Sequence, residues 1–222
     1  MNTIILFAEI ALCFTAVVLV SRVFGKEGLT AWVAVASVAA NIMTAKTSTI
    51  LGMDAATGTV LFASTFLATD ILCECYDARA ARRAVCVGLS AIIGFVVAAQ
   101  ITLLYTPAPY DYADGAMRTL FSLNLRISAA SALMYFLANM ADVTIFSKMK
   151  KAGSKLWLRN NVATIVCNCA ENFAFIFLAF IGIYTARECV TIALSTSIIE
   201  AIVAICDTPF LYIAKGIANS EA

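Results

Sequence analysis

This 222-residue chain contains no histidine and few charged residues. Histidine is the commonest general base and metal ligand, so its absence argues against His-dependent catalytic triads. Charged residues make up 13% of the chain, whereas about 25% is usual for a soluble domain. Such a low charge content indicates a protein whose solvent is lipid.

Several functional motifs are also missing. The chain has no G-x-x-x-x-G-K-[ST] segment, so we do not expect it to bind ATP through a P-loop. It has no T-V-G-Y-G segment and no Lys- or Arg-rich channel, which leaves an ion channel with little support. No nucleophile and base pair is visible, and an intramembrane enzyme therefore has only weak support. We expect no cofactor.

The eight cysteines mostly fall inside apolar runs, where a free thiol behaves as a small hydrophobic group. We expect no disulfide framework. Cys73 and Cys75 are separated by one residue, as are Cys167 and Cys169, and such neighbours point to different faces of a helix. Neither pair can form half of a zinc site, so we expect no metal.

Hydrophobic residues are abundant, at 62% of the chain, and the mean hydropathy is +0.92. A membrane-spanning helix needs about 20 mostly apolar residues. Seven apolar stretches predict an all-α polytopic membrane protein with seven transmembrane helices in one membrane domain: 4–24, 29–46, 57–76, 83–106, 119–147, 159–184 and 188–214. The second is the weakest, because Lys46 interrupts it, and the polar segment up to Gly58 is a candidate re-entrant or unwound stretch. The first lacks a basic leader and predicts a retained helix rather than a signal peptide.

Basic residues are distributed unevenly between the loops. Eleven of the fifteen fall on one side of the seven spans: Arg22, Lys26, Arg79, Arg82, Arg83, Lys148, Lys150, Lys151, Lys155, Arg159 and Lys215. The other side has Lys46, Arg118 and Arg187, and Arg126 falls within a span. Cytoplasmic loops carry the excess of Lys and Arg, so we expect the amino terminus outside and the carboxyl terminus inside.

Ionisable and amide side chains within the spans form two predicted groups. Such residues are costly in lipid and normally face the bundle interior, a partner or a ligand. The group toward the cytoplasm could be a structural carboxylate and arginine network or a transport gate, and both alternatives stay open: Asp70, Glu74, Arg82, Asp142 and Asp207. Asp70 and Glu74 have the i, i+4 spacing that places two side chains on one helix face.

The second group lies from mid-membrane outward and comprises Asn41, Lys46, Arg126, Asn168, Glu171, Asn172 and Glu200. If these side chains converge, they form a polar pocket with apolar walls, and such a pocket favours ligand binding. The alternative for the amides is hydrogen bonding between helices. Aromatic side chains in the same regions could stack on a flat heterocycle, although any single one could instead pack against lipid.

Four blocks of sequence carry a resemblance to a known family: A-N-I-M-T-A-K-T at 40–47; F-L-A-T-D-I-L-C-E-C-Y with A-R-R at 66–83; L-R-I-S-A-A-S and A-N-M-A-D-V-T-I-F-S-K-M-K at 125–150; and W-L-R-N-N-V-A-T-I-V-C-N-C-A-E-N at 157–172 with D-T-P-F-L-Y at 207–212. From about residue 29 onward the chain resembles the queuosine precursor transporter family, also called the vitamin uptake transporter family.

The resemblance implies a transporter core at 29–222 with six helices, similar to the substrate-binding components of energy-coupling-factor vitamin importers, preceded by an additional helix at 1–28. It implies uptake of 7-deazaguanine bases across a bacterial cytoplasmic membrane. The expected partners are a small nucleobase and lipid, with no nucleic acid, and homo-oligomerisation stays open. A substrate-binding component that needs an ATP-driven module remains the alternative.

The chain departs from the family pattern at Asn168, at Glu171 and Asn172, at Asp77, and at Glu200, where a lysine is expected. Glu171 is our expected principal recognition residue, because one carboxylate can accept both the ring N1-H and the exocyclic amine of a guanine-like edge. Asn168 or Asn172 would then serve O6. Glu200 would favour a base with a cationic amine, queuine or the aminomethyl form, over the neutral nitrile; the alternative is that Glu200 pairs with Arg126 or Lys46.

Overall fold

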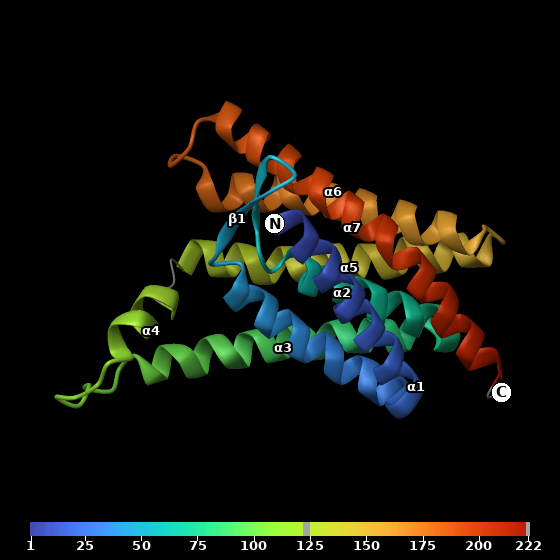
Figure 1. The fold of residues 1–222 in the computed structure, drawn as a ribbon, viewed down its shortest axis with the longest axis horizontal. Coiled ribbons are helices and arrows are strands. Elements are labelled where there is room, and N and C mark those ends of the chain that lie inside the picture. Colours follow the sequence, from blue (N-terminus) through green and yellow to red (C-terminus); the bar gives the residue numbers. More distant parts are fainter. Residues whose placement is uncertain (122–124, 221–222) are drawn as a thin grey trace.

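The computed structural model describes residues 1–121 and 125–220, and for residues 125–128 only the backbone. Helix α1 (Asn2–Met43) consists of two arms joined at Gly25. Gly25 has φ 57° and ψ −139°, a left-handed backbone region that favours glycine. The chain turns back here, since the Asn2 amide at the start of the first arm donates to the backbone oxygen of Thr49, beyond the second arm, at 2.9 Å (Figure 1).

A short β-hairpin follows α1 where we expected a re-entrant or unwound segment. Strand β1 (Thr47–Ile50) pairs antiparallel with β2 (Met53–Ala56). Leu51 and Gly52 connect them with φ values of 54° and 78°. Two positive φ angles in a two-residue loop match the twist of paired strands. The segment is therefore ordered by its own strand pairing, because polar alternation and a glycine turn fit a hairpin better than a helix.

The next span changes helix type along its length. Helix α2 (Thr59–Ile71) continues into a π-helical turn, η1 (Leu72–Tyr76). Asp77 then adopts an extended backbone and caps helix α3 (Ala78–Thr102), its Oδ1 accepting a hydrogen bond from the Ala80 N–H at 2.6 Å. The π turn widens the helix, so residues four apart across it no longer share a face.

Four more helices complete the fold. They are α4 (Asp114–Phe121), α5 (Leu125–Lys151), α6 (Leu156–Phe180) and α7 (Ala186–Ser220), which has Pro209 in its interior. The predicted fifth stretch began too early, since α4 is a separate helix that ends at Phe121. Six of the described helices are long and apolar enough to cross a membrane. Because α1 folds back on itself, these six provide the seven predicted passes, and the chain is an all-α polytopic membrane protein.

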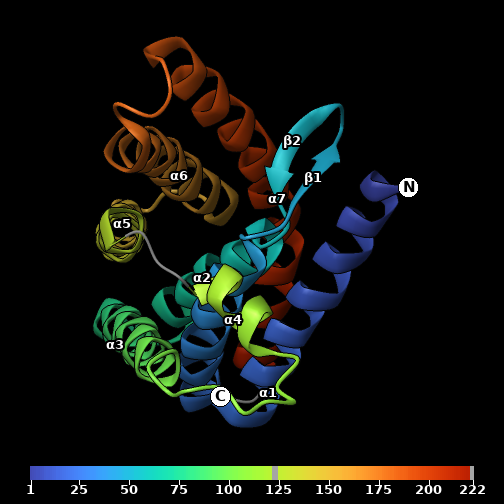
Figure 2. The ribbon, with the colours of Figure 1, turned by 90° about the vertical axis from the view of Figure 1, so that its left-hand side faces the viewer.

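Helix α2 lies at the centre of the bundle, in contact with α1, α3, α5 and α7 (Figures 1 and 2). Apolar side chains face outward and polar side chains face inward, as expected of a protein surrounded by lipid. Large apolar side chains such as Leu12, Val35 and Ile205 are exposed, whereas Asp, Asn and Thr side chains are buried between the helices. Small residues let backbones approach closely, and a Cβ at Gly88 would lie only 2.1 Å from the Tyr135 hydroxyl.

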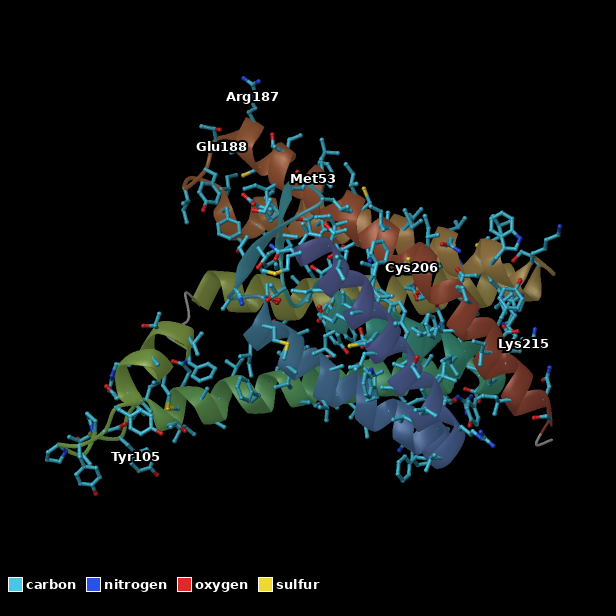
Figure 3. The ribbon with its side chains drawn as sticks, viewed as in Figure 1. Met53, Tyr105, Arg187, Glu188, Cys206 and Lys215 are labelled. Atoms are coloured by element: carbon cyan, nitrogen blue, oxygen red, sulfur yellow. The ribbon has the colours of Figure 1, made fainter. Side chains whose placement is uncertain are left out.

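The two ends of the bundle differ in character. The hairpin end carries the β-hairpin, α4 and the α6–α7 connection, and the basic end carries the Gly25 bend, η1, the α5–α6 connection and the carboxyl terminus. Figure 3 shows Tyr105 and Arg187 toward the hairpin end and Lys215 at the basic end. The eleven basic residues grouped in the sequence belong to segments of the basic end.

Candidate functional site

Glu74 is the centre of an ion cluster at the basic end. Its carboxylate pairs with Arg159, with Lys215 Nζ at 2.7 Å and with Lys150 Nζ at 3.6 Å. Lys150 also donates to the backbone oxygens of Cys73 and Glu74 at 2.9 and 2.6 Å. The Arg159 guanidinium lies over the Phe146 ring, 5.3 Å from its centroid. The cluster ties η1 to α5, α6 and α7.

The expected carboxylate and arginine network is only partly formed. Arg82 is exposed and donates to Thr144 Oγ1 at 3.3 Å, because the register of α3 turns it away from Glu74. Asp70 does not belong to the Glu74 ion cluster either. The π turn between Asp70 and Glu74 rotates the two carboxylates into different surroundings.

Asp70, Asp142 and Asp207 form a second group, the buried carboxyl cluster, from α2, α5 and α7. All three have 0% exposure. Asp70, Asp142 and Asp207 lie near enough to one another to interact electrostatically. Asn160 Nδ2 donates to Asp207 Oδ1 at 2.6 Å, and Thr164 Oγ1 donates to Asp142 Oδ1 at 3.2 Å.

The third group lies between α6 and α7 in the middle of the bundle. Asn172 Nδ2 donates to Glu200 Oε2 at 2.6 Å and reaches Ser197 Oγ at 3.3 Å. Glu171 is close enough to interact electrostatically with Glu200 and with Tyr135 on α5. We call Glu171, Asn172 and Glu200 the acidic recognition cluster. Among the described residues, no Lys or Arg forms a salt bridge with either carboxylate.

Helix α6 connects the two groups. Asn160, Thr164, Asn168 and Asn172 are spaced four apart and all are buried, so they form one polar stripe along the helix. Asn168 lies between the acidic recognition cluster and the buried carboxyl cluster, and its Oδ1 has no hydrogen-bond partner among the described residues. At a rise of 1.5 Å per residue the stripe is about 18 Å long.

Aromatic rings border the recognition cluster on the side of α5 and α2. The rings of Tyr135 and Phe62 lie 6.1 Å apart, and Phe62 meets Phe66 edge to face at 5.5 Å. Tyr135 and Phe66 are buried. A wall of this kind suits stacking of a flat ring.

The structure brings together only part of the predicted outer group. Asn41 accepts a hydrogen bond from Ser131 of α5 at 3.1 Å and donates to the Ser37 backbone at 2.8 Å. Lys46 lies elsewhere, in a cavity of about 280 Å³ beneath the hairpin that Asn2 and Glu9 of α1 also line. Lys46 therefore does not pair with Glu200. The side chain of Arg126 lies outside the described residues.

Several residues of these clusters were not predicted from the sequence to be site residues. They are Asn160, Thr164, Arg159, Lys150 and Lys215. The spacing of the four-residue polar stripe on α6 was a usable signal for the first two. Partners of Glu74 could not be found this way, because three separate helices bring them together.

A family description, "Putative vitamin uptake transporter", matches residues 56–214. The chain is 35% identical over 212 residues to the "Probable queuosine precursor transporter" of Bacillus subtilis, covering 94% of this chain and 93% of that protein. It is 29% identical over 133 residues to the "Queuosine precursor transporter" of Escherichia coli, covering 59% and 58%. No solved structure matches significantly.

These matches include the helices that carry all three polar groups, and the resemblance seen in the sequence is confirmed. The bundle, its apolar exterior and its buried polar interior suit a protein that moves a small molecule through the membrane. The chain is an integral membrane protein and belongs to the vitamin uptake transporter family.

Proposed function

We propose that this protein imports a 7-deazaguanine precursor or salvage base for queuosine, through the acidic recognition cluster. The observation that carries the proposal is a pair of acids and an amide, Glu171, Asn172 and Glu200, held between two membrane helices. Such groups are costly in lipid and are kept where a ligand or partner uses them. The names of the two relatives support the ligand class.

Glu171 is the proposed principal recognition residue. It is half-buried, and among the described residues no donor hydrogen-bonds to its carboxylate. Its two oxygens can accept the ring N1-H and the exocyclic amine together. Asn168, one turn away on α6, or Asn172 would present its amide N–H to the base O6. Phe62 and Tyr135 would stack on the ring.

Glu171→Ala tests this assignment. The variant should insert into the membrane normally but lose uptake of the base, because the ligand's donors would be buried without an acceptor. Glu188→Gln at the hairpin end of α7 is the matched control and should keep uptake. Near-normal binding by Glu171→Ala would rule out the assignment.

Glu200 is proposed to select bases with a cationic amine, queuine or the aminomethyl form, over the neutral nitrile form. Two neighbouring carboxylates with no salt-bridged cation among the described residues are compensated best by a ligand that carries positive charge. Competition binding on wild type and Glu200→Gln would decide. The idea fails if the nitrile base competes as well as queuine, or if Glu200→Gln keeps the wild-type preference.

The proposed setting is the bacterial cytoplasmic membrane, with the amino terminus outside and the basic end inside. Residues 29–222 would form a six-helix core like that of vitamin-importer binding components, and the first arm of α1 would be an addition packed against it, as the Phe14 and Phe210 rings show at 5.5 Å. Uptake into liposomes by the purified chain alone would establish a carrier. Uptake only with an added ATP-driven module would establish the alternative.

A further inference from the structure

The buried carboxyl cluster contains more hydrogen-bond acceptors than donors. Four carboxylate oxygens receive no hydrogen bond from any described residue: both of Asp70, Oδ2 of Asp142 and Oδ2 of Asp207. The donors nearest to them already have other acceptors. Asn160 Nδ2 donates to Asp207 Oδ1, and Thr164 Oγ1 donates to Asp142 Oδ1. Only a donor or cation from outside the described residues can satisfy the remaining oxygens: an added proton, a bound water or a positive ion.

Asn160 contributes a further acceptor without a donor at the same site. It has 0% exposure, and its amide reaches into the cluster through its bond to Asp207. Its Oδ1 nevertheless has no partner among the described residues. An amide oxygen without a donor, next to Asp207, adds to the excess of acceptors at the site.

In the part of the chain that the structure describes, no Lys or Arg forms a salt bridge with the three carboxyl groups. The titratable groups that interact with the cluster are Cys73 on η1, Cys167 on α6 and Cys206 on α7. Lys150 of α5 lies near Cys73, but its ion pair is with Glu74. Arg159, directly before Asn160, is directed to Glu74 instead. Three neighbouring carboxylates in a fully buried site are not all ionised together, because burial and nearby like charges both disfavour the charged form.

The carboxyl groups of the cluster are better suited to bind a proton than a metal ion. Asp70 and Asp142 are both fully buried and near each other, and neighbouring buried carboxyl groups are stabilised when one of them holds a proton. The described residues contain no group of three or more acidic or cysteine side chains arranged to hold a metal. We propose that Asp70, Asp142 and Asp207 bind the proton whose inward movement drives uptake of the base.

Helices α6 and α7 connect the two sites. Asp207 and Glu200 both lie on α7, and on α6 Asn160 hydrogen-bonds to Asp207 and Asn172 hydrogen-bonds to Glu200. Glu200 and Asp207 are two turns apart on α7, and the polar stripe on α6 joins the levels. Two of the three helices that carry the carboxyl cluster are irregular close to it. The π turn begins two residues after Asp70, and Pro209, two residues after Asp207, removes one helical hydrogen bond.

In this scheme a carboxylate of the cluster takes up a proton from the outer side and becomes a carboxylic acid, and it returns the proton to the inner side after the base is released. No covalent step is involved. The scheme rests on the proposed uptake function, but protonation of the cluster can be measured without the base.

The transport test uses purified protein in liposomes with the membrane potential clamped by valinomycin and equal potassium. One proton per base and a gradient of one pH unit, acid outside, should sustain at most about tenfold accumulation. Asp70→Asn and Asp142→Asn, which imitate the protonated acid, should still exchange labelled base across the membrane but should not accumulate it. Asp142→Glu should restore accumulation, and Asp114→Asn on α4 is the matched control that should behave as wild type.

The spectroscopic test measures the infrared C=O stretch of a protonated carboxyl group at neutral pH. Part of this band should disappear in Asp70→Asn and Asp142→Asn and remain in Asp114→Asn. Accumulation driven by a sodium gradient at constant pH, or accumulation that persists in both Asn variants, would overturn the proton assignment. If wild type transports no base, the proposed function fails, and the infrared comparison alone decides whether the cluster holds a proton.

Discussion

Glu74→Gln is the sharpest test of the ion cluster at the basic end, because it removes one charge and keeps the shape. The side chains of Glu74 and Arg159 are 3% and 8% exposed, so the substitution leaves a buried guanidinium without its counter-charge. Breaking a buried pair in this way costs about 3–5 kcal/mol. Lys150 and Lys215 are each more than a third exposed and contribute little more.

For a chain of this size, that loss should lower the melting temperature in detergent by roughly 6–20 °C. The matched control is Glu27→Gln, since Glu27 and Lys26 form a pair at 3.8 Å with exposures of 81% and 51%, and its melting temperature should stay near that of wild type. A shift for Glu74→Gln no larger than that of the control would refute the structural role. If stability is unchanged while uptake changes, the cluster is a gate.

Two further predictions concern packing and topology. Gly88→Ala should destabilise the protein by about 1–3 kcal/mol, because the new methyl would lie 2.1 Å from the Tyr135 hydroxyl; Gly94→Ala, on the same helix with open space around it, should not destabilise, and equal melting temperatures would contradict the packing. A cysteine at Lys151 should react with a membrane-impermeant reagent only from the cytoplasmic side, and labelling from outside intact cells would invert the proposed topology.

The number of membrane passes was predictable because hydrophobic length alone sets it. The sequence also separated the basic end from the hairpin end through the distribution of Lys and Arg. The hairpin at 47–56 was missed, since two strands of four residues give only a short alternating pattern, and such a segment reads equally well as an unwound stretch. The π turn at 72–76 leaves no recognisable pattern in one sequence.

The candidate site was predictable in its residue types and only partly in its groupings. Asn172 and Glu200, both predicted members of the outer group, are hydrogen-bonded to each other because both face the interface between α6 and α7. Lys46 was grouped with them by depth, but depth does not say on which side of α2 a side chain lies, and Lys46 lines the cavity under the hairpin. Asp70 and Glu74 were grouped by ideal helix spacing, which the π turn breaks.

The most direct test of the central claim is a binding cycle between Glu171 and the exocyclic amine of the base. Affinities would be measured by calorimetry for wild type and Glu171→Ala, each with a 7-deazaguanine and with its analogue lacking the 2-amino group. In wild type, loss of a hydrogen bond to a charged group should weaken binding by about ten- to 150-fold. Glu171→Ala should bind both ligands equally. If removal of the 2-amino group weakens binding as much in Glu171→Ala as in wild type, Glu171 does not bind the exocyclic amine of the base.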